Sequence, residues 1–234
     1  MPLILTLNVG SSSVKGASFD AKEDGPALAR AELDGLGARV QFAAGVRGAP
    51  LVNLDLGAEA PADHDAAIRT VFDWLLAQST GESLAAVGHR VVHGGLKYAA
   101  PVLVDEAVLA DLSALIPLAP LHQPHNLAGL RAAFAMAKSA PQVACFDTAF
   151  HRQHPFVADT FALPKSFYEE GVRRYGFHGL SYEYVNSRLR EIEPDLADGR
   201  VVLAHLGNGA SMCATLGGRS VATTMGFTAL EGLP

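Results

Sequence analysis

The amino-acid sequence predicts an α/β fold in which helices cover a mixed β-sheet. The first observation is the order β-β-β-α-β-α-β of the strand-like and helix-like segments in residues 1–150, which is typical of a sheet packed against helices. The second is a change from alternating to helical spacing of the apolar residues near residue 63. The third is a pair of strand–turn–strand units with Asn, Gly and Ser at their tips, near residues 10 and 208, which indicates a duplicated fold.

The N-terminal hairpin is predicted from the stretch LILTLNVGSSSVKG. Its apolar run breaks at Asn8 and resumes at Val14. A tight hairpin needs only Asn-Gly at its turn, but this tip also carries three serines, and Lys15 follows it. Successive backbone N–H groups in a glycine-containing turn form an anion site. The tip therefore suits an anion, although a plain hairpin turn is the better explanation when the tip is considered alone.

The middle of the chain is predicted to alternate strands and helices. The predicted strands cover residues 27–33, short runs within 39–56, 84–95 and 142–147, and the predicted helices cover 63–81, 105–115 and 124–138. The first of these helices has Asp63 or Asp65 as its N-cap and Gly81 as its stop. The third has proline in its first turn, where proline is well tolerated.

The second part of the chain begins near residue 151 and ends in three predicted strands. The predicted elements are an amphipathic helix over 181–191 and strands over 201–206, 212–216 and 220–224. The turn between the first two strands is rich in glycine, and it is the second turn of the chain that suits an anion.

The composition excludes several classes of protein. The chain has 234 residues, of which 49% are hydrophobic and 18% charged, so it can bury a core. A net charge of -6 argues against a nucleic-acid partner. Cys145 and Cys213 lie in apolar runs, which is typical of buried reduced thiols. The first residues lack a secretory signal and no apolar run is long enough to span a bilayer, so we expect a cytoplasmic protein with no membrane partner.

Several polar residues follow apolar strands or precede helices. In GHRVVHGG, Arg90 ends a buried strand, where a guanidinium can bind a small anion bidentately; this role is slightly favoured over a structural one. Asp147 also ends a strand, where α/β folds place reactive groups, although aspartates there also cap helices. His122 and His125 lie in a proline-containing loop and suit packing equally well. His178 precedes a helix, and capping explains it better when it is considered alone.

Together these segments resemble the acetate kinase family. LNVGSSSVKG, GHRVVHGG, PLAPLHQPHN, FDTAFH, RYGFHGLSYEYV and HLGNGASMCA, with TTMGFTALEG, occur in the family's order and spacing over residues 3–232. The resemblance implies the fold of the acetate and sugar kinase, Hsp70 and actin superfamily, which has duplicated ribonuclease H-like (actin-like ATPase) domains. It also implies reversible phosphoryl transfer from ATP to acetate, giving acetyl phosphate and ADP, with Mg²⁺ or alternatively Mn²⁺.

The resemblance further implies roles for individual residues. The catalytic residues that it implies are Asp147, Arg90 and His178, and Asn8 is placed near the metal ion. The residues that it implies for acetate binding are Arg90, Val92, Leu121, His122 and Phe177. The residues that it implies for nucleotide binding are Ser12, Lys15, His205, Leu206, Gly207, Asn208 and Gly209. Acetate has a pKa of about 4 and needs no deprotonation at neutral pH. We therefore expect Asp147 to position Mg²⁺ and its waters first and to act as a base only second.

Two departures from the family pattern carry expectations. At Ala229 the family has proline, so a wider methyl pocket and a relaxed preference for acetate over propionate are expected. The resemblance divides the chain into a first actin-like domain over residues 1–150, without its closing helix, and the beginning of a second, nucleotide-binding domain over 151–234. The 234-residue chain alone is then expected to have little or no kinase activity, whereas full-length family members form homodimers.

Three alternatives remain at this point. A propionate or butyrate kinase is separated from an acetate kinase by the ratio of activities on the acids. A non-catalytic, truncated remnant would bind phosphate or a partner but not catalyse transfer. An ATPase switch of the actin or Hsp70 type would share the hairpins but would leave Arg90, His122 and the Phe177–His178 turn without a purpose.

Overall fold

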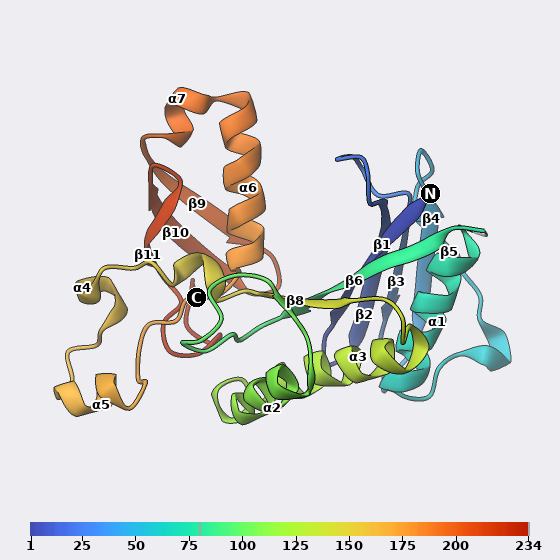
Figure 1. Ribbon diagram of the computed structural model, residues 1–234, viewed down its shortest axis with the longest axis horizontal. Helices are drawn as coiled ribbons and strands as arrows, with labels where there is room; N and C mark the ends of the chain where they lie inside the picture. Colours follow the sequence, from blue (N-terminus) through green and yellow to red (C-terminus); the bar gives the residue numbers. More distant parts are fainter. Residues whose placement is uncertain (80, 234) are drawn as a thin grey trace. The chain divides into compact units, whose positions relative to one another are not determined.

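The computed structural model describes residues 1–79 and 81–233, and these form two compact units. The first unit comprises Met1–Val91, Val102–Ser113 and Leu121–Ala144, and the second comprises Val92–Pro101, Ala114–Pro120 and Cys145–Pro234. The chain therefore passes between the units several times. Figure 1 shows the ribbon coloured along the sequence.

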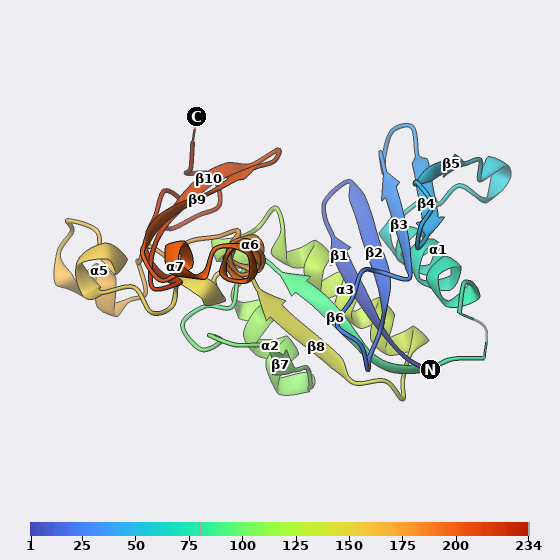
Figure 2. The same ribbon diagram turned by 90° about the horizontal axis from the view of Figure 1, so that it is seen from above.

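The first unit is built on a mixed sheet. Its strands are β1 (Pro2–Val9), β2 (Ser13–Asp20), β3 (Ala29–Asp34), β4 (Gln41–Val46), β5 (Val52–Leu54), β6 (Ser83–Val91), β7 (Val102–Leu103) and β8 (Gln142–Phe146), whose last two residues belong to the second unit. The strand order is β5-β4-β3-β2-β1-β6-β8-β7, and Figure 2 shows β6 between β1 and β8. Because β1 pairs antiparallel with β2 and parallel with β6, the predicted mixed sheet is confirmed.

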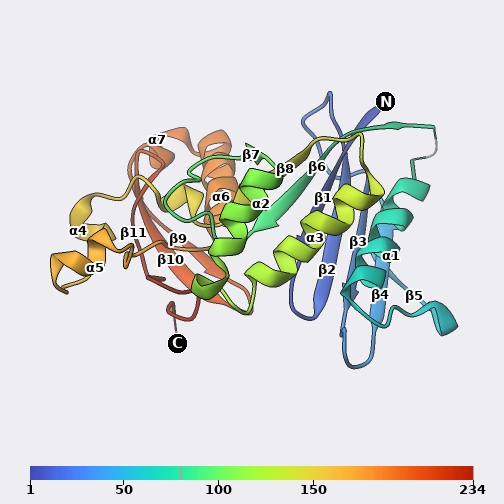
Figure 3. The same ribbon diagram turned by 60° about the horizontal axis from the view of Figure 1, so that its bottom comes forward.

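Two helices of this unit pack against its sheet. The helices are α1 (His64–Ala77), α2 (Glu106–Ala114) and α3 (Gln123–Met136), with a 3-10 turn at Gly57–Glu59, and α1 and α3 contact the strands. Figure 3 shows α1 and α3 side by side over the strands. Alternate residues of β1 are buried, which is the period-2 pattern of a strand with one face on a core. α1 and α2 lie within the ranges predicted from the sequence, and α3 begins one residue before its predicted range of 124–138.

The N-terminal hairpin and α1 are in close contact. The Asp63 carboxylate accepts a hydrogen bond from the Ala66 N–H at 2.8 Å, so the predicted N-cap is confirmed. A Cβ at Gly16 would lie 2.8 Å from the Leu75 side chain, so only glycine lets the helix approach β2 this closely. The helix ends at Ala77, four residues before the predicted stop.

The second unit combines short helices with a three-stranded antiparallel sheet. Its elements are two 3-10 turns (Ile116–Leu118 and Ala149–His151), α4 (Phe156–Asp159), α5 (Lys165–Glu169), α6 (Gly179–Ile192), α7 (Pro194–Ala197), β9 (Arg200–Leu206), β10 (Ala210–Leu216) and β11 (Arg219–Thr223). The strand order is β11-β10-β9, and α6 packs against β9 (Figure 1). The predicted helix and three strands are confirmed, whereas α4, α5 and α7 were not predicted.

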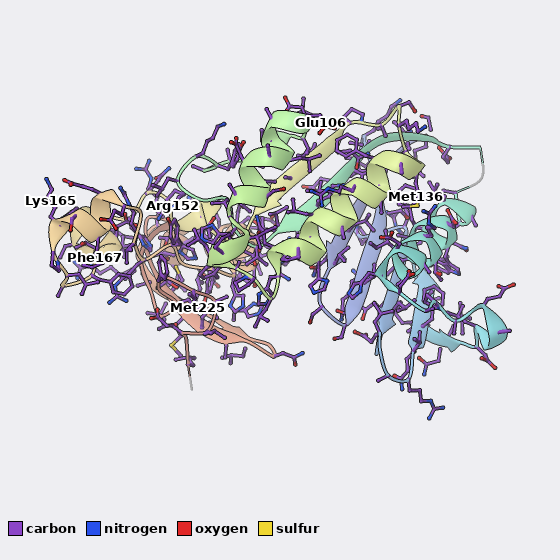
Figure 4. The ribbon with its side chains drawn as sticks, turned by 90° about the horizontal axis from the view of Figure 1, so that it is seen from below. Glu106, Met136, Arg152, Lys165, Phe167 and Met225 are labelled. Carbon is purple, nitrogen blue, oxygen red and sulfur yellow. The ribbon has the colours of Figure 1, made fainter. Side chains whose placement is uncertain are left out.

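A buried ion pair ties the start of this unit together. The Asp159 carboxylate accepts hydrogen bonds from Arg152 at 2.9 Å, from Tyr168 at 3.2 Å and from Arg173 at 3.4 Å. Arg152, labelled in Figure 4, also lies 5.3 Å from the centre of the Tyr175 ring. Breaking such a pair by removing one partner costs about 3–5 kcal/mol, because the other charge is left buried.

Both cysteines are free thiols, as predicted; Cys213 is buried as expected, whereas Cys145 is only half-buried. Burial raises the pKa of Cys213 to about 11, although a hydrogen bond with Ser220 opposes this shift. Burial also raises the pKa of Cys145, and the Glu183 carboxylate adds to the increase. Within residues 1–79 and 81–233, no helix has both the length and the apolar character needed to cross a bilayer.

Four histidines are held in environments that disfavour their charged form. Burial lowers the pKa of His89, His93 and His154 to about 4 and that of His151 to about 3. His89 is hydrogen-bonded to Gln142 at 2.8 Å, which partly opposes the shift. His151 lies between the Ser220 hydroxyl, at 2.8 Å, and the Phe177 carbonyl, at 2.9 Å.

These histidines make stability depend on pH. In the unfolded chain each binds a proton below about pH 6.5, but in the folded chain only below about pH 4 or 3. The unfolded state therefore binds more protons between these values, and the free energy of unfolding falls as the pH drops from 6.5 to about 4. Thermal unfolding followed by circular dichroism should show a falling Tm over this window.

Substitution isolates one of these groups. In His89→Gln, the pH dependence of the unfolding free energy should fall by the contribution of about one proton. In the control His125→Gln, whose ring is only half-buried, most of the wild-type pH dependence should remain. A Tm that stays constant from pH 7 to pH 4.5 would contradict the account.

Candidate functional site

The turn after β1 is held from both sides by helix residues. The buried Val9 carbonyl accepts a hydrogen bond from the Asn126 amide at 2.8 Å, and the Gly10 carbonyl lies 3.1 Å from His64 Nε2. Inside the turn, the Gly10 N–H donates to the Ser13 carbonyl at 2.8 Å. The conformation of the turn is therefore fixed by α1, α3 and its own backbone.

The contact with His64 determines where the next amide points. The Gly10 carbonyl and the Ser11 N–H belong to one trans peptide and point in opposite directions. Because His64 holds the carbonyl, the Ser11 N–H is turned to the other side of the chain. Ser11 and Ser12 are exposed, so the turn offers a backbone N–H and two hydroxyl groups to an anion.

Three histidines gather where α1 and α3 begin. The rings of His64 and His125 stack with their centres 4.6 Å apart. Burial lowers the pKa of His125, and charge on His64 or His122 lowers it further. The His125 N–H also donates to the His122 carbonyl at 3.1 Å, so all three histidines are neighbours. Helix N-termini carry partial positive charge, so this end of the first unit favours an anion.

Arg90 and Asn8 are hydrogen-bonded to each other. An Arg90 guanidinium N–H donates to Asn8 Oδ1 at 3.2 Å. Both residues lie near the carboxyl ends of the adjacent parallel strands β1 and β6, where open α/β sheets bind their ligands. The structure thus brings together two of the residues that the sequence singled out.

The other predicted residues of the first unit are more peripheral. Lys15 forms an ion pair with Glu32 at 3.1 Å on the adjacent strand, and both side chains are partly exposed. His122 is the N-cap of α3 and is half-buried. Leu121 is 62% exposed. Their proposed ligand contacts stay predictions.

In the second unit, Asp147 and His178 are joined through the backbone. Asp147 follows β8 and is buried, and its carbonyl accepts a hydrogen bond from the Gly179 N–H at 2.8 Å. His178 has a φ of 59°, and no other non-glycine residue among residues 1–79 and 81–233 has a positive φ. A non-glycine residue in this region costs about 1–3 kcal/mol, and such residues cluster at functional sites.

The His178 ring lies against the second glycine turn. It stacks on His205 with ring centres 4.0 Å apart, and its Nδ1 lies 2.8 Å from the Ser211 hydroxyl. A Cβ at Gly209 would lie 3.3 Å from both Cε1 and Nε2 of the ring. The Nε2 edge of the ring therefore faces this turn, so His178, His205 and Gly209 form one cluster.

The tip of the hairpin itself is open to solvent. Leu206 pairs with Ala210 at the end of the ladder, so Gly207, Asn208 and Gly209 form the turn. These three residues are exposed, and Leu206 is 74% exposed. His205 Nδ1 lies 2.9 Å from the Ser181 hydroxyl, which fixes this ring beside α6.

An apolar cluster lies within the same unit. Val92, Ala119, Tyr175, Phe177 and Met225 form its buried part, and Leu118, Phe227 and Ala229 pack against it. Met225 is labelled in Figure 4. Val92 and Phe177, which the resemblance assigned to the methyl pocket, thus lie together with Ala229.

Some residues that shape the site were not predicted from the sequence. His64 and Asn126 hold the first turn, and Ser211 and Tyr182 contact each other beside His178. The amphipathic pattern of 181–191 did not reveal that Tyr182 has a polar partner. For these residues, the sequence offered one indication: His64 directly follows the N-cap of a predicted helix.

Few side chains are grouped to hold a metal ion. In the part of the chain that the structure describes, no cluster of three or more His, Cys, Asp or Glu residues could hold one. Asn8 offers an amide oxygen and Asp147 a carboxylate, the ligand types that Mg²⁺ prefers. Mg²⁺ usually binds through one or two such groups together with water and substrate phosphates, so each of the two residues, taken by itself, fits an ion delivered with a nucleotide.

Comparison with known proteins decides the family. A model of the acetokinase family matches residues 3–234. The chain belongs to this family. Acetate kinases from Methylocella silvestris and Nitrobacter hamburgensis are 54% and 52% identical to it, over 99% and 100% of this chain but only 59% and 58% of their own lengths. The chain thus spans about three fifths of these acetokinase relatives.

Solved acetokinase structures share the fold. A propionate kinase from Francisella tularensis superposes with a TM-score of 0.87 at 34% identity, and an acetate kinase from Porphyromonas gingivalis with 0.83 at 35%. Each match covers the whole of this chain and 59% of the other. The predicted family and the predicted α/β fold, a mixed sheet flanked by helices as in actin-like ATPases, are confirmed.

The contact between Asn126 and Val9 can be tested by substitution. Asn126→Ala leaves the buried Val9 carbonyl without this donor and should lower the free energy of unfolding by about 1–3 kcal/mol. Urea unfolding measures the change. Gln78→Ala removes an exposed hydrogen bond to Trp74 and should change it by less than about 0.5 kcal/mol. Equal effects of the two substitutions would show that the hydrogen bond from Asn126 to the Val9 carbonyl does not stabilise the fold.

Proposed function

We propose that the whole protein is an acetate kinase, which transfers the γ-phosphoryl group of ATP to acetate and forms acetyl phosphate and ADP reversibly. The observation that carries the proposal is the pairing of Arg90 with Asn8 at the ends of adjacent parallel strands, next to a turn shaped for an anion. Membership of the acetokinase family and the similarity to acetate kinases support the choice of substrates.

The reaction requires little proton transfer. An acetate oxygen attacks the γ-phosphorus, the bond from that phosphorus to the bridging oxygen breaks, and ADP leaves with the electron pair. Acetate is already ionised at neutral pH, so no base has to act. Catalysis then consists mainly of placing the reactants in line and stabilising charge on the transferring oxygens.

Different residues of the chain bind the substrates and stabilise the charge. In the first unit, Arg90 binds the acetate carboxylate and the phosphoryl oxygens with its planar guanidinium, while the Ser12 turn and Lys15 bind nucleotide phosphates. In the second unit, His178 stabilises charge on the phosphoryl group and the turn over residues 207–209 binds phosphate. Asn8 of the first unit would hold Mg²⁺, and Asp147 of the second unit would orient water of a bound Mg²⁺. The ion would supply charge neutralisation when it is bound with ATP.

The assignment of Arg90 is testable in the complete gene product. Acetyl phosphate formed from ATP and acetate is trapped as the hydroxamate, and ADP is measured in parallel. Arg90→Lys keeps the charge but loses the bidentate geometry, so kcat/KM should fall about 10²–10³-fold.

A matched arginine provides the control. Arg47→Lys, at an exposed arginine of the same unit, should leave the rate unchanged. Absence of acetyl phosphate in the wild-type protein would refute the proposed function.

Propionate is a second candidate substrate. The similarity to a propionate kinase supports it, and so does Ala229, which packs on the apolar cluster that contains Val92 and Phe177. One methylene in an apolar pocket is worth about 1–3 kcal/mol. Ala229→Pro should therefore raise the acetate-to-propionate ratio of kcat/KM about tenfold. Equal ratios in the two proteins would remove Ala229 as a determinant of chain length.

The assembly and location are proposed on the same resemblance. We infer a cytoplasmic homodimer with acetate, ATP and Mg²⁺ as its small-molecule partners. Light scattering coupled to gel filtration of the complete gene product tests the homodimer directly. A molecular mass of one subunit at micromolar concentration would contradict it.

A further inference from the structure

Three side chains of the second unit form a linear hydrogen-bonded chain. The Tyr182 hydroxyl lies 2.5 Å from Ser211 Oγ, and Ser211 Oγ lies 2.8 Å from His178 Nδ1. Ser211 is 0% exposed and Tyr182 is 1% exposed. At such burial no bulk water replaces a missing partner, so a hydroxyl hydrogen without an acceptor is costly.

The number of hydrogens restricts how this chain can be bonded. Each hydroxyl has one hydrogen, and neutral imidazole has one N–H. If His178 Nδ1 carried its hydrogen, it would donate to Ser211. Ser211 and Tyr182 would then hold two hydroxyl hydrogens with a single contact between them, and one hydrogen would have no acceptor among the described residues.

The opposite arrangement satisfies every hydroxyl. Tyr182 donates to Ser211, Ser211 donates to His178 Nδ1, and the ring hydrogen sits on Nε2.

We propose that Ser211 and Tyr182 are positioning residues that fix His178 in its Nε2–H tautomer and thereby present an N–H donor to the glycine turn at Gly209. The position of Nε2 supports the second part, because a Cβ at Gly209 would lie 3.3 Å from that atom. The ligand that such a donor suits is an anionic oxygen, such as a phosphoryl oxygen of a nucleotide.

The catalytic meaning of this arrangement rests on the proposed function. A histidine that stabilises charge on a transferring phosphoryl group has to donate a hydrogen bond, and the wrong tautomer would direct a lone pair at it. The stacked His205 ring is held separately by Ser181. The tautomer itself can be measured without any turnover, so its test does not depend on kinase activity.

The test is a two-bond ¹H–¹⁵N correlation spectrum of the ¹⁵N-histidine-labelled 234-residue chain at pH 8, with His178 assigned from the His178→Gln variant. The wild-type spectrum should show His178 with Nε2 protonated and Nδ1 as a hydrogen-bonded acceptor. In Ser211→Ala the Nδ1 resonance should move to the position of an acceptor without a hydrogen bond. Tyr182→Phe keeps the ring but removes the donor to Ser211. The Ser211 hydroxyl then has Nδ1 as its only acceptor, so His178 should keep the Nε2–H tautomer with a weaker hydrogen bond at Nδ1.

Ser181→Ala is the matched control, because it removes a hydroxyl from His205 and not from His178. It should change the His205 resonances and leave those of His178 in place. A protonated Nδ1 in the wild-type chain would overturn the inference, and so would a His178 spectrum that is unchanged in Ser211→Ala. Either result leaves the kinase assignment standing, whereas loss of the kinase assignment leaves the tautomer result standing.

Discussion

The first candidate ligand site depends on two backbone carbonyl groups, those of Val9 and Gly10. Asn126 and His64 hold them from the beginnings of α3 and α1. A trans peptide is rigid, so fixing its oxygen also fixes the direction of its N–H. The direction of the Ser11 N–H is therefore set by the helices that contact the turn as well as by the hairpin.

The candidate site of the second unit is fixed by different contacts. His178 sits in a left-handed backbone conformation, and its ring lies between His205 and the turn at Gly209. α6 begins directly after His178, and its Gly179 N–H is bonded to the Asp147 carbonyl. His178 and the buried Asp147 are thus linked by one backbone hydrogen bond.

The regular elements of the fold were predictable because their signals are local. Alternating apolar residues indicated β1, and Asp63 with the helical spacing after it indicated α1. The contacts that shape the sites were not predictable, because they join distant residues. Asn126 lies 117 positions from Val9, and Tyr182 lies 29 positions from Ser211. Arg90 was found because it ends an apolar strand, but its partner Asn8 is 82 positions away.

We propose that the turn held by His64 binds a nucleotide phosphate through the Ser11 N–H. Titration of the ¹⁵N-labelled chain with ATP and Mg²⁺, followed in ¹H–¹⁵N spectra, tests this contact. The Ser11 amide resonance should shift progressively on titration, and His64→Ala should reduce or abolish the shift. A Ser11 resonance that does not move at millimolar ATP would contradict it.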